Sequence, residues 1–271
     1  MVWGSWRLCR LRVIPRQQLN ILDLDGMMAP RTILVTGAGT GIGAATARRV
    51  AAGNSLILHC NNSKDEALEL QEELRQQCVD VIVVSADLMT ETGCRALVEE
   101  VRGRFSALDA LVNNAGGMIE RRSVAELTWE HLADSFALNT LSAMRVTALC
   151  VELLRGGNNP CVVNVTSIAM RHGAPSATAY GAAKAALDSF TRGAANELAP
   201  DIRVNAVAPG MIDTSFHDRV TPAEKMAKFV ENTPLKRVGT VQEIARVVEF
   251  LLDNEFITGE TIDCNGGLSM R

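Results

Sequence analysis

Short apolar runs alternate with longer amphipathic stretches along most of this chain. From Thr32 onward, runs of six to ten residues rich in valine, isoleucine and leucine recur at regular intervals, as expected for buried strands. The stretches between them carry apolar residues at helical spacing. Expected strands cover residues 32–37, 55–60, 80–87, 107–116, 161–167, 202–210 and 258–267. Expected helices cover residues 41–52, 64–77, 91–105, 127–155, 176–199 and 241–252.

This alternation predicts a parallel sheet covered by helices on both faces. A strand, a helix and a second strand form a right-handed crossover, which makes the two strands parallel. The length of 271 residues suits one such unit, and the sequence shows no internal repeat. We therefore expect an α/β fold, a Rossmann-type doubly wound sheet of about seven strands in a single domain. Its ligand site is expected at the carboxyl ends of the strands.

The N-terminal segment differs from the rest of the chain. It has four arginines among its first sixteen residues and no acidic residue before Asp23. Such a start is typical of an organellar transit peptide, but this one has a single serine and no apolar segment long enough for a secretory signal. We expect residues 1–27 to be a disordered extension, or to precede a working start at Met27 or Met28. The folded domain is then residues 28–271.

Composition and charge exclude several kinds of partner. The net charge is −4, from 27 basic and 31 acidic residues, which favours neither nucleic acid nor an anionic membrane as a partner. No apolar run approaches the ~18 residues that a membrane span needs. The seven cysteines and four histidines show no metal-ligand spacing, so no metal site is expected. Scattered cysteines of odd number suit reduced thiols, and we expect a cytoplasmic protein.

A glycine-rich segment, TGAGTGIG, joins the first expected strand to the first expected helix. A structural turn would explain an isolated glycine cluster. Its place at the first strand–helix junction instead favours a dinucleotide site, because a helix N-terminus presents N–H groups to phosphate. Gly37 permits a sharp turn, Gly41 a close approach of the backbone to phosphate, and Gly43 close packing of helix on strand. The cofactor contacts expected here are Thr36, Gly37, Gly39, Thr40, Gly41, Ile42 and Gly43.

The segment after the second expected strand bears on the choice between NAD and NADP. An acidic residue there would hydrogen-bond the ribose 2′-hydroxyl of NAD and repel the 2′-phosphate of NADP. The sequence HCNNSK has no acid, and Asn61, Asn62 and Ser63 can hydrogen-bond a phosphate beside Lys64. We expect NADP, with NAD as the alternative. An ordinary polar turn would also explain these residues.

Tyr180, the only tyrosine of the chain, stands four residues before Lys184 in an expected helix. Residues at this spacing share one helix face. A lysine ammonium close by favours the phenolate and would lower the tyrosine pKa, which suits a general acid or base. Ser167 ends the fifth expected strand, where its hydroxyl could polarise the same carbonyl oxygen. A surface pair would have the same spacing, but the alanines around it suit close packing.

Together these features resemble the short-chain dehydrogenase/reductase family, in its single-domain branch of about 250 residues. The resemblance runs from about Thr32 to Gly267, nearly the whole chain beyond the extension. So many motifs in the family's order make the resemblance specific. The matching motifs are TGxxxGxG (36–43), Asp87-Leu88, NNAG (113–116), Asn139 in ALNTL, Ser167, Tyr180 with Lys184, and PGMIDT (209–214).

The resemblance implies an active enzyme without a metal. Tyr180 would be the general acid/base, Ser167 would hold the substrate oxygen, Lys184 would bind the nicotinamide ribose, and Asn139 would link Lys184 to solvent through a water. Hydride would pass between the nicotinamide and a carbonyl or carbinol carbon. A homotetramer, or a homodimer, paired through the two longest helices is also implied. The further cofactor contacts implied are Asp87, Leu88, Asn114, Ala115, Gly116, Tyr180, Lys184, Pro209, Gly210, Ile212 and Thr214.

The substrate is expected to be small and polar. The segments expected around it, residues 117–123, 168–175 and 211–220, combine cationic side chains with few large apolar groups. A sugar, polyol or sugar acid suits them better than a steroid, although charges that simply face solvent would explain them too. These side chains are Arg121, Arg122, Arg171, His172, His217 and Arg219.

Two other functions stay open. The sequence is also similar to 3-oxoacyl-[acyl-carrier-protein] reductases, which present basic residues to an acidic carrier. Asn158 and Asp201 stand near where arginines would be expected, whereas Arg155 and Arg203 keep such docking open. The other possibility is a non-catalytic, cofactor-binding regulator on the same fold. The complete set of four expected catalytic residues argues against that regulator.

Overall fold

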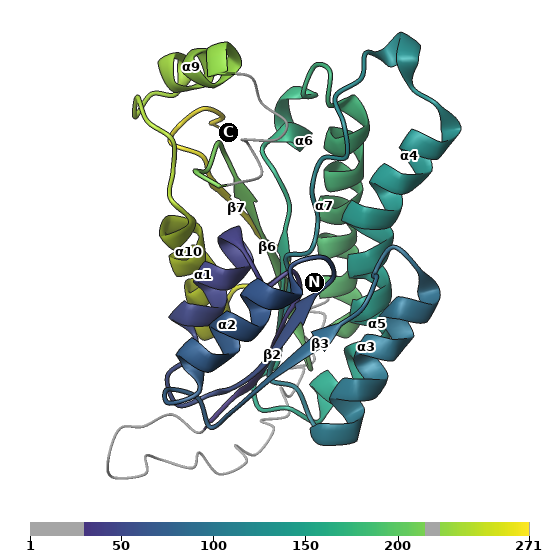
Figure 1. The fold of residues 1–271 in the computed structure, drawn as a ribbon, viewed down its shortest axis with the longest axis vertical. Coiled ribbons are helices and arrows are strands. Elements are labelled where there is room, and N and C mark those ends of the chain that lie inside the picture. The colour runs from purple at the N-terminus through teal and green to yellow at the C-terminus, as the bar shows by residue number, and fades with distance from the viewer. Residues whose placement is uncertain (1–29, 215–222, 271) are drawn as a thin grey trace, which may run out of the picture.

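A computed structural model describes residues 30–214 and 223–270, in which seven parallel strands form one sheet (Figure 1). The strand order is β3-β2-β1-β4-β5-β6-β7, which confirms the doubly wound Rossmann-type α/β fold in a single domain. The expected extension at residues 1–27 lies outside the described residues. The strands are β1 (Thr32–Val35), β2 (Ser55–Cys60), β3 (Asp80–Ser85), β4 (Ala110–Asn113), β5 (Cys161–Val165), β6 (Arg203–Pro209) and β7 (Thr261–Cys264).

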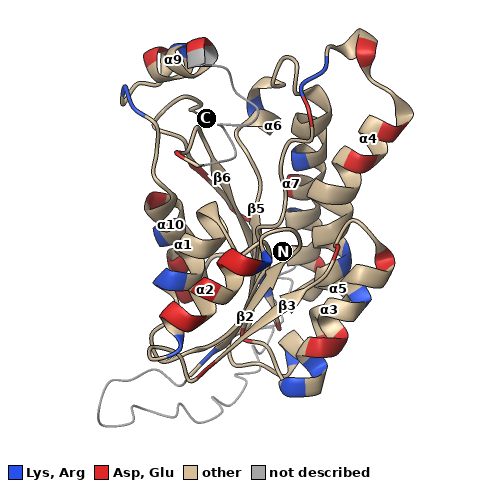
Figure 2. Ribbon diagram, viewed as in Figure 1, with Lys and Arg blue, Asp and Glu red and all other residues tan. Residues whose placement is uncertain are grey.

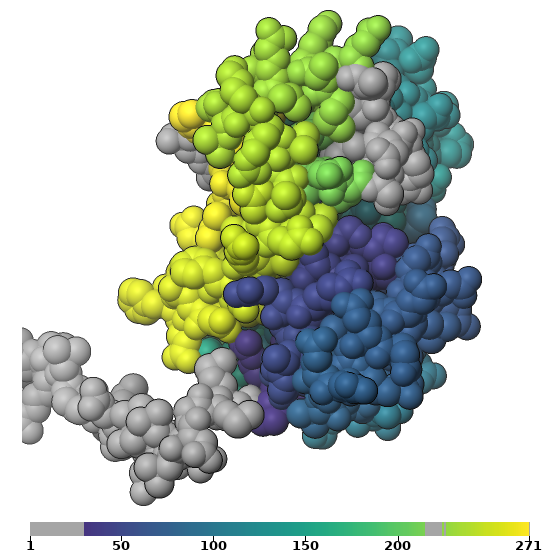
Figure 3. All heavy atoms as spheres, turned by 60° about the vertical axis from the view of Figure 1, so that its left-hand side comes forward, coloured from purple at the N-terminus to yellow at the C-terminus, as the bar shows by residue number. Residues whose placement is uncertain are grey.

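Alternate side chains of the strands supply two separate cores. In β1, Ile33 and Val35 belong to one apolar cluster, and Leu34 between them belongs to the other. Both faces of the sheet are covered, which is why its strands appear as continuous apolar runs. One face carries α1 (Gly41–Arg49), α2 (Lys64–Leu74) and α10 (Val241–Asp253), with α1 and α10 side by side in Figure 3. The other carries α3 (Glu91–Arg104), α5 (Ser142–Arg155) and α7 (Thr178–Leu198).

The single helix expected at 127–155 is interrupted by a π-helical turn. Helix α4 (Trp129–Phe136) leads into η2 (Ala137–Leu141), and α5 continues from there. A π turn accommodates an extra residue without ending the helix. The apolar spacing on either side therefore still matches one continuous helix, and the pattern does not reveal the turn.

Three short elements of the described chain are absent from the sequence prediction. They are η1 (Val124–Glu126), α6 (Ala169–His172) and α9 (Ala223–Asn232). The first two span only 3 and 4 residues and contribute few positions to any periodic pattern. The expected strands also extend past most of the observed carboxyl ends, because the residues that follow them lie in the loops at that edge of the sheet. These loops and short helices surround the site described below.

A set of hydrogen bonds ties the loop after β1 to the loop after β4. The Thr36 hydroxyl oxygen accepts the N–H groups of Asn114 and Ala115, both at 3.0 Å, and donates to the Val112 carbonyl at 3.3 Å. The Asn114 amide donates to the carbonyls of Thr36 (2.9 Å) and Gly37 (3.0 Å). The two loops meet where the order of strands reverses, which is the point at which doubly wound sheets bind ligands.

Arg203 is a buried structural residue and is not available to a carrier protein. Its guanidinium donates to the carbonyls of Leu251, Leu252 and Asn254 at 2.8–2.9 Å, at the C-terminal end of α10. A cation there satisfies carbonyls that the helix leaves without partners. Arg155 is paired with Glu152 at 2.7 Å. The expectation that Arg203 keeps carrier docking open is therefore wrong.

Charges of both signs alternate on the outer helices (Figure 2). Two ion pairs of 2.7 Å join Arg48 to Glu73 and Arg49 to Glu249, between neighbouring helices of one face. Within the described chain, one helical stretch, Trp129–Arg155, is long and apolar enough to cross a membrane by length and composition. Half of its most apolar window is buried inside the fold.

Candidate active site

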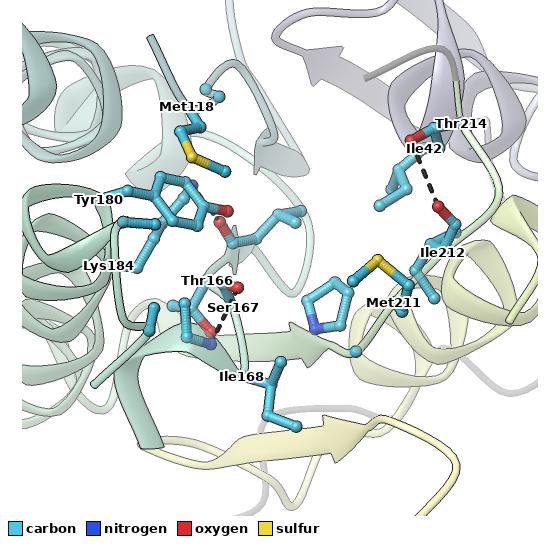
Figure 4. Close-up of a pocket in the computed structure, with 18 of the residues that line it drawn as sticks. Ile42, Met118, Thr166, Ser167, Ile168, Tyr180, Lys184, Met211, Ile212 and Thr214 are labelled. Carbon is cyan, nitrogen blue, oxygen red and sulfur yellow. Dashed lines mark hydrogen bonds between the residues drawn. The ribbon is translucent and has the colours of Figure 1, made fainter. Parts of the chain in front are cut away.

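A cavity of about 470 Å³ opens at the carboxyl edge of the sheet. Figure 4 shows Met118, Tyr180 and Lys184 on one side of it and Ile42, Ile212 and Thr214 on the other. The expected site residues that line it are Gly37, Thr40, Gly41, Ile42, Ser63, Asn114, Ala115, Gly116, Ser167, Tyr180, Lys184, Pro209, Gly210, Ile212 and Thr214. Those that lie outside its lining are Thr36, Gly39, Gly43, Asn61, Asn62, Asp87, Leu88 and Asn139.

The glycine turn at the start of α1 has the geometry of a phosphate cradle. Gly37 and Gly41 have φ of +63° and +56°, values that favour glycine. A Cβ on Gly43 would lie 2.1 Å from the Gly37 carbonyl oxygen, so only glycine lets α1 approach the turn this closely. No side chain caps the N-terminus of α1, and no acid lies in its first turn. These residues fit the pyrophosphate of a dinucleotide.

His59 connects the glycine turn to the loop after β3. The ring is buried, and its Nδ1 accepts the Gly37 N–H at 3.2 Å. Its Nε2 lies 3.0 Å from the Ala86 carbonyl, which can only accept a proton, so Nε2 carries the hydrogen. Burial lowers the pKa of His59, while the Ala86 carbonyl and Asp87 act in the opposite direction. His59 is therefore a neutral bridge whose Nδ1 must stay unprotonated to hold Gly37.

We expect His59 to make dinucleotide binding and stability sensitive to acid. The unfolded chain takes up a proton on this histidine near pH 6.5, before the folded protein does, so the free energy of unfolding falls as the pH drops below that value. His59→Asn can still accept the Gly37 N–H but does not titrate. Dissociation constants for NADPH and NADH between pH 5 and 8 should rise at low pH in the wild type and change less in this variant. An equally steep profile in His59→Asn would contradict the role, and His172→Asn serves as the control.

The end of the second strand supplies one residue to the cavity. Ser63 lines it and packs against Gly39, where an added Cβ would lie 2.3 Å from the Ser63 hydroxyl oxygen. Asn61 donates to a carboxylate oxygen of Asp87 at 3.4 Å, and the same oxygen accepts the N–H of Met89 at 3.0 Å. The structure thus places Asn61 beside Asp87, which the resemblance assigns to the adenine.

Ser167, Tyr180 and Lys184 come together in the cavity from β5 and α7. Ser167 follows the end of β5, and its hydroxyl oxygen accepts the N–H of Ala169 at 3.1 Å and shares a hydrogen bond with Tyr180. Lys184 lies one turn along α7 from Tyr180, is 3% exposed, and donates from Nζ to the Val165 carbonyl at 2.8 Å. One strand end and one helix face thus hold all three polar groups.

Burial sets the proton affinities of Tyr180 and Lys184. It raises the pKa of Tyr180, an effect that the hydrogen bond with Ser167 partly offsets. It lowers the pKa of Lys184 to about 8. Burial is the largest effect on Tyr180, so the net direction of its pKa is upward, opposite to the lowering expected from the lysine charge. A protonated Tyr180 at neutral pH is suited to donate a proton.

Asn139 lies in the π turn, behind the wall of the cavity. Its side-chain amide donates to the carbonyls of Ser135 (3.0 Å) and Gly117 (2.8 Å), and its Oδ1 accepts the Gly117 N–H at 2.8 Å. A Cβ on Gly116 would lie 2.9 Å from Asn139 Oδ1 and 3.0 Å from Lys184 Nζ. The amide oxygen and the ammonium therefore converge on the same small space behind Gly116.

The outer part of the cavity is formed by two loops, one after β4 and one between α6 and α7. Of the cationic side chains expected near the substrate, Arg121 and His172 line the cavity, whereas Arg122 and Arg171 do not. His217 and Arg219 lie outside the described residues. Phe229 of α9 and Leu268 also line the cavity, and no local motif in the sequence predicts them because they come from distant parts of the chain. We call the following residues the rim: Met118, Arg121, His172, Ala174, Pro175 and Ala177.

Comparison with known proteins identifies the family. A family model described as enoyl-(acyl carrier protein) reductase matches residues 37–269. The uncharacterized oxidoreductase YmfI of Bacillus subtilis is 37% identical, over 88% of this chain and 98% of its own. The 3-oxoacyl-[acyl-carrier-protein] reductase FabG of Staphylococcus aureus is 32% identical, over 90% of this chain and 100% of its own.

A solved structure described as the NADH-dependent reductase A1-R′ responsible for alginate metabolism has a TM-score of 0.82. It is 30% identical, and the match covers 90% of this chain and 98% of that one. No group of metal-ligating side chains occurs among the residues described here. Fold, motifs and relatives agree: the chain is an NAD(P)-dependent oxidoreductase and belongs to the short-chain dehydrogenase/reductase family.

Proposed function

We propose that the protein interconverts a carbonyl and a secondary alcohol on a small polar substrate such as a sugar, polyol or sugar acid. The observation that carries this proposal is the convergence of Ser167, Tyr180 and Lys184 in the same cavity as the glycine turn. A dinucleotide lying along the strand ends from that turn would reach these three groups. The same cavity would then hold both the dinucleotide, which donates the hydride, and Tyr180, which donates the proton.

The cofactor would be held by the glycine turn, the loops after β4 and β6, and Lys184. When bound, NAD(P)H supplies the hydride and NAD(P)⁺ accepts it in the reverse direction. Gly116 and Gly210 let the chain pack closely at two points of the cavity wall, because Cβ atoms there would lie 2.9 Å from Asn139 Oδ1 and 2.7 Å from the Asn265 Cα. The chain thus supplies a binding surface, orientation and proton chemistry.

Four side chains of the protein would donate the proton to the substrate oxygen, position that oxygen, and return a proton from solvent to the donor. Tyr180, kept protonated by burial, donates its proton to the substrate oxygen as the carbonyl is reduced. Ser167 donates a hydrogen bond to the same oxygen and fixes its position. Lys184 carries its charge beside the phenol below a pH of about 8. Asn139 connects Lys184 to solvent through a water, so that Tyr180 can regain its proton.

NADP is the proposed cofactor and NAD the alternative. The absence of an acid after β2 and the position of Ser63 in the cavity lining support NADP. The likeness to a reductase described as NADH-dependent supports NAD. Titration with NADPH and NADH, followed by fluorescence, separates them. Tighter binding of NADH by tenfold or more would reject the NADP assignment.

The test of function is oxidation of the tighter-binding cofactor with a panel of sugars, sugar acids, acetoacetyl thioesters and simple ketones. Turnover of sugars or sugar acids is the expected result. The likeness to FabG favours a 3-oxoacyl reductase as second candidate, and preferential turnover of acetoacetyl thioesters would establish it. Cofactor binding with no turnover of any carbonyl would instead support a regulator.

We also propose a homotetramer or homodimer in the cytoplasm, paired through α4–α5 and α7. Trp129 and Leu141 are large apolar side chains on the α4–α5 stretch that remain 79% and 55% exposed in the single chain. Burying them against a second copy would remove apolar surface from water. Light scattering of the purified protein measures the mass directly.

A further inference from the structure

Helix α6 is too short to fix its own orientation. It spans four residues, Ala169–His172, directly after the site residue Ser167. A single turn has too few internal hydrogen bonds to be stable alone, so contacts with the rest of the chain decide where it lies. The Ser167 hydroxyl oxygen accepts the N–H of Ala169 at 3.1 Å, which couples the serine side chain to the first residue of α6. Any shift of α6 therefore reaches the hydroxyl that is hydrogen-bonded to Tyr180.

Arg171 connects α6 to the two elements beside it. Its Nε donates to Asp263 of β7 at 3.2 Å, and its Nη1 lies 3.8 Å from a carboxylate oxygen of Asp188 in α7. These three side chains are only 17%, 16% and 7% exposed, so water and salt screen their charges weakly. Asp188 is itself held in place, because its carboxylate accepts the Thr261 hydroxyl at 2.7 Å and Arg192 Nη1 at 2.6 Å.

The backbone of α6 also packs closely on α7, which lies beside it in Figure 1. A Cβ on Gly181 would lie 3.1 Å from the Ala169 carbonyl oxygen, and Gly181 follows Tyr180 directly. The first residue of α6 therefore lies against α7 next to the phenol. Arg171 fastens the other end of α6, so that two contacts together set the direction of this short helix.

Stability alone does not account for a buried cation between two carboxylates. Taking these groups out of water costs much of what their attraction returns, and apolar side chains can often replace buried ion pairs without loss of stability. Arg171 Nη2 is also buried and has no hydrogen-bond partner among the described residues, which adds to the cost. The pairs do provide direction, since a guanidinium between Asp188 and Asp263 has one preferred position.

We propose that Arg171 is a positioning residue for proton transfer: its two ion pairs hold α6 so that the Ser167 hydroxyl stays directed at Tyr180. This inference rests on the proton chemistry of the proposed function, to which it adds a residue outside the cavity lining. Arg171 was expected around the substrate from its place in the sequence. In this role it acts from behind the site, through Ser167.

The first test uses the single tyrosine of the chain. Protein labelled with ¹³C at tyrosine Cζ gives one NMR signal, which reports the surroundings of the Tyr180 hydroxyl. We expect Arg171→Met to move this signal in the same direction as Ser167→Ala does. In the Ser167→Ala background, Arg171→Met should move it no further, because the hydroxyl through which Arg171 acts is already absent. A direct effect of the lost charge on Tyr180 would persist in that background.

Arg192→Met is the matched control. It removes another cation from the same carboxylate of Asp188, but its side chain is 53% exposed and belongs to α7, so α6 keeps its pairs with Arg171. This variant should leave the tyrosine signal in its wild-type position. Arg171→Lys keeps the charge without the planar fork and should give an intermediate displacement.

The second test assays the same variants with the carbonyl compounds of the functional test. Arg171→Met should lower kcat by about tenfold, the effect of losing one hydrogen bond to the reacting groups. The Kd of the dinucleotide should stay within about twofold, because the glycine turn is unchanged. Arg192→Met should keep the wild-type kcat. If Arg171→Met does not fold, Arg171→Lys and Asp263→Asn replace it, since each weakens the pairing with a smaller change of charge or shape.

Three results would overturn the inference. They are a tyrosine signal that stays in place in the Arg171 variants, an equal displacement with and without the Ser167 hydroxyl, and a kcat that is unchanged while the signal moves. Failure of the proposed function is distinct, because then the wild type reduces no carbonyl or Tyr180→Phe keeps its activity. The NMR comparison needs no substrate and still decides whether Arg171 positions Ser167.

Discussion

Tyr180→Phe should lower kcat by about 10²- to 10⁴-fold, the range that a positioned general acid contributes. The substitution removes one oxygen and leaves the ring packed beside Met118 and the alanines of its small cluster. Cofactor affinity should stay within about twofold, because the glycine turn and Lys184 are unchanged. Stability should fall by about 1 kcal/mol through the lost hydrogen bond with Ser167.

The measurement combines steady-state rates with cofactor titration and thermal unfolding of the same preparations. Ser189→Ala is a suitable control, since Ser189 is exposed on the same helix and loses a hydroxyl of similar size. If Tyr180→Phe kept more than a tenth of the wild-type rate, a different proton donor would have to be sought. Ser167→Ala should be affected less severely, because it positions the substrate oxygen without supplying its proton.

Gly43→Ala should weaken dinucleotide binding by about 100-fold and lower Tm by several degrees. The added Cβ would lie 2.1 Å from the Gly37 carbonyl oxygen and 2.5 Å from Asn114 Nδ2. These two atoms are hydrogen-bonded to each other at 3.0 Å, so neither can move away easily. Helix α1 must therefore shift outward, which displaces the N–H groups at its start. Overpacking of this kind typically costs about 1–3 kcal/mol, and in a chain of this size each kcal/mol corresponds to about 2–4 °C in Tm.

Gly103→Ala is the matched control for that substitution. Gly103 lies in α3, and a Cβ there would meet no atom within 4 Å. Alanine has the higher helix propensity, so this variant should be as stable as wild type or slightly more stable. Isothermal titration with the preferred dinucleotide and calorimetric Tm values measure both effects. Unchanged affinity in Gly43→Ala would show that the start of α1 does not hold the phosphates.

Much of the fold was predictable because its signals are local. Each buried strand is a run rich in branched apolar residues, and the junction after the first strand carries a recognisable glycine-rich turn. The π turn was not predictable from periodicity, since it preserves the apolar face on either side. Asn139 was assigned to the site through the family resemblance alone.

Many of the residues that line the cavity were predictable from the sequence, but the proton affinities of those residues were not. Tyr180 and Lys184 were identified by spacing, and the structure places both in one cavity. The direction of the Tyr180 pKa depends on burial by residues far apart in sequence, which spacing does not encode. Arg203 was misjudged for the same reason: its partners lie about fifty residues away, at the end of α10.

The ion pairs of Arg171 have a consequence for how this protein could diverge. They fasten α6, the helix directly after Ser167, to α7 and β7, away from the loop that carries Arg121. The proton chemistry therefore rests on elements that these ion pairs fasten together. Part of the rim lies on a loop after β4, which is joined to them by backbone hydrogen bonding of Arg122 to Ser176 and by the bonds between Gly117 and Asn139. Substitutions in that loop can alter which compound is accepted while the reaction itself is preserved. A duplicated copy could thus acquire a new substrate in few steps, without passing through an inactive ancestor.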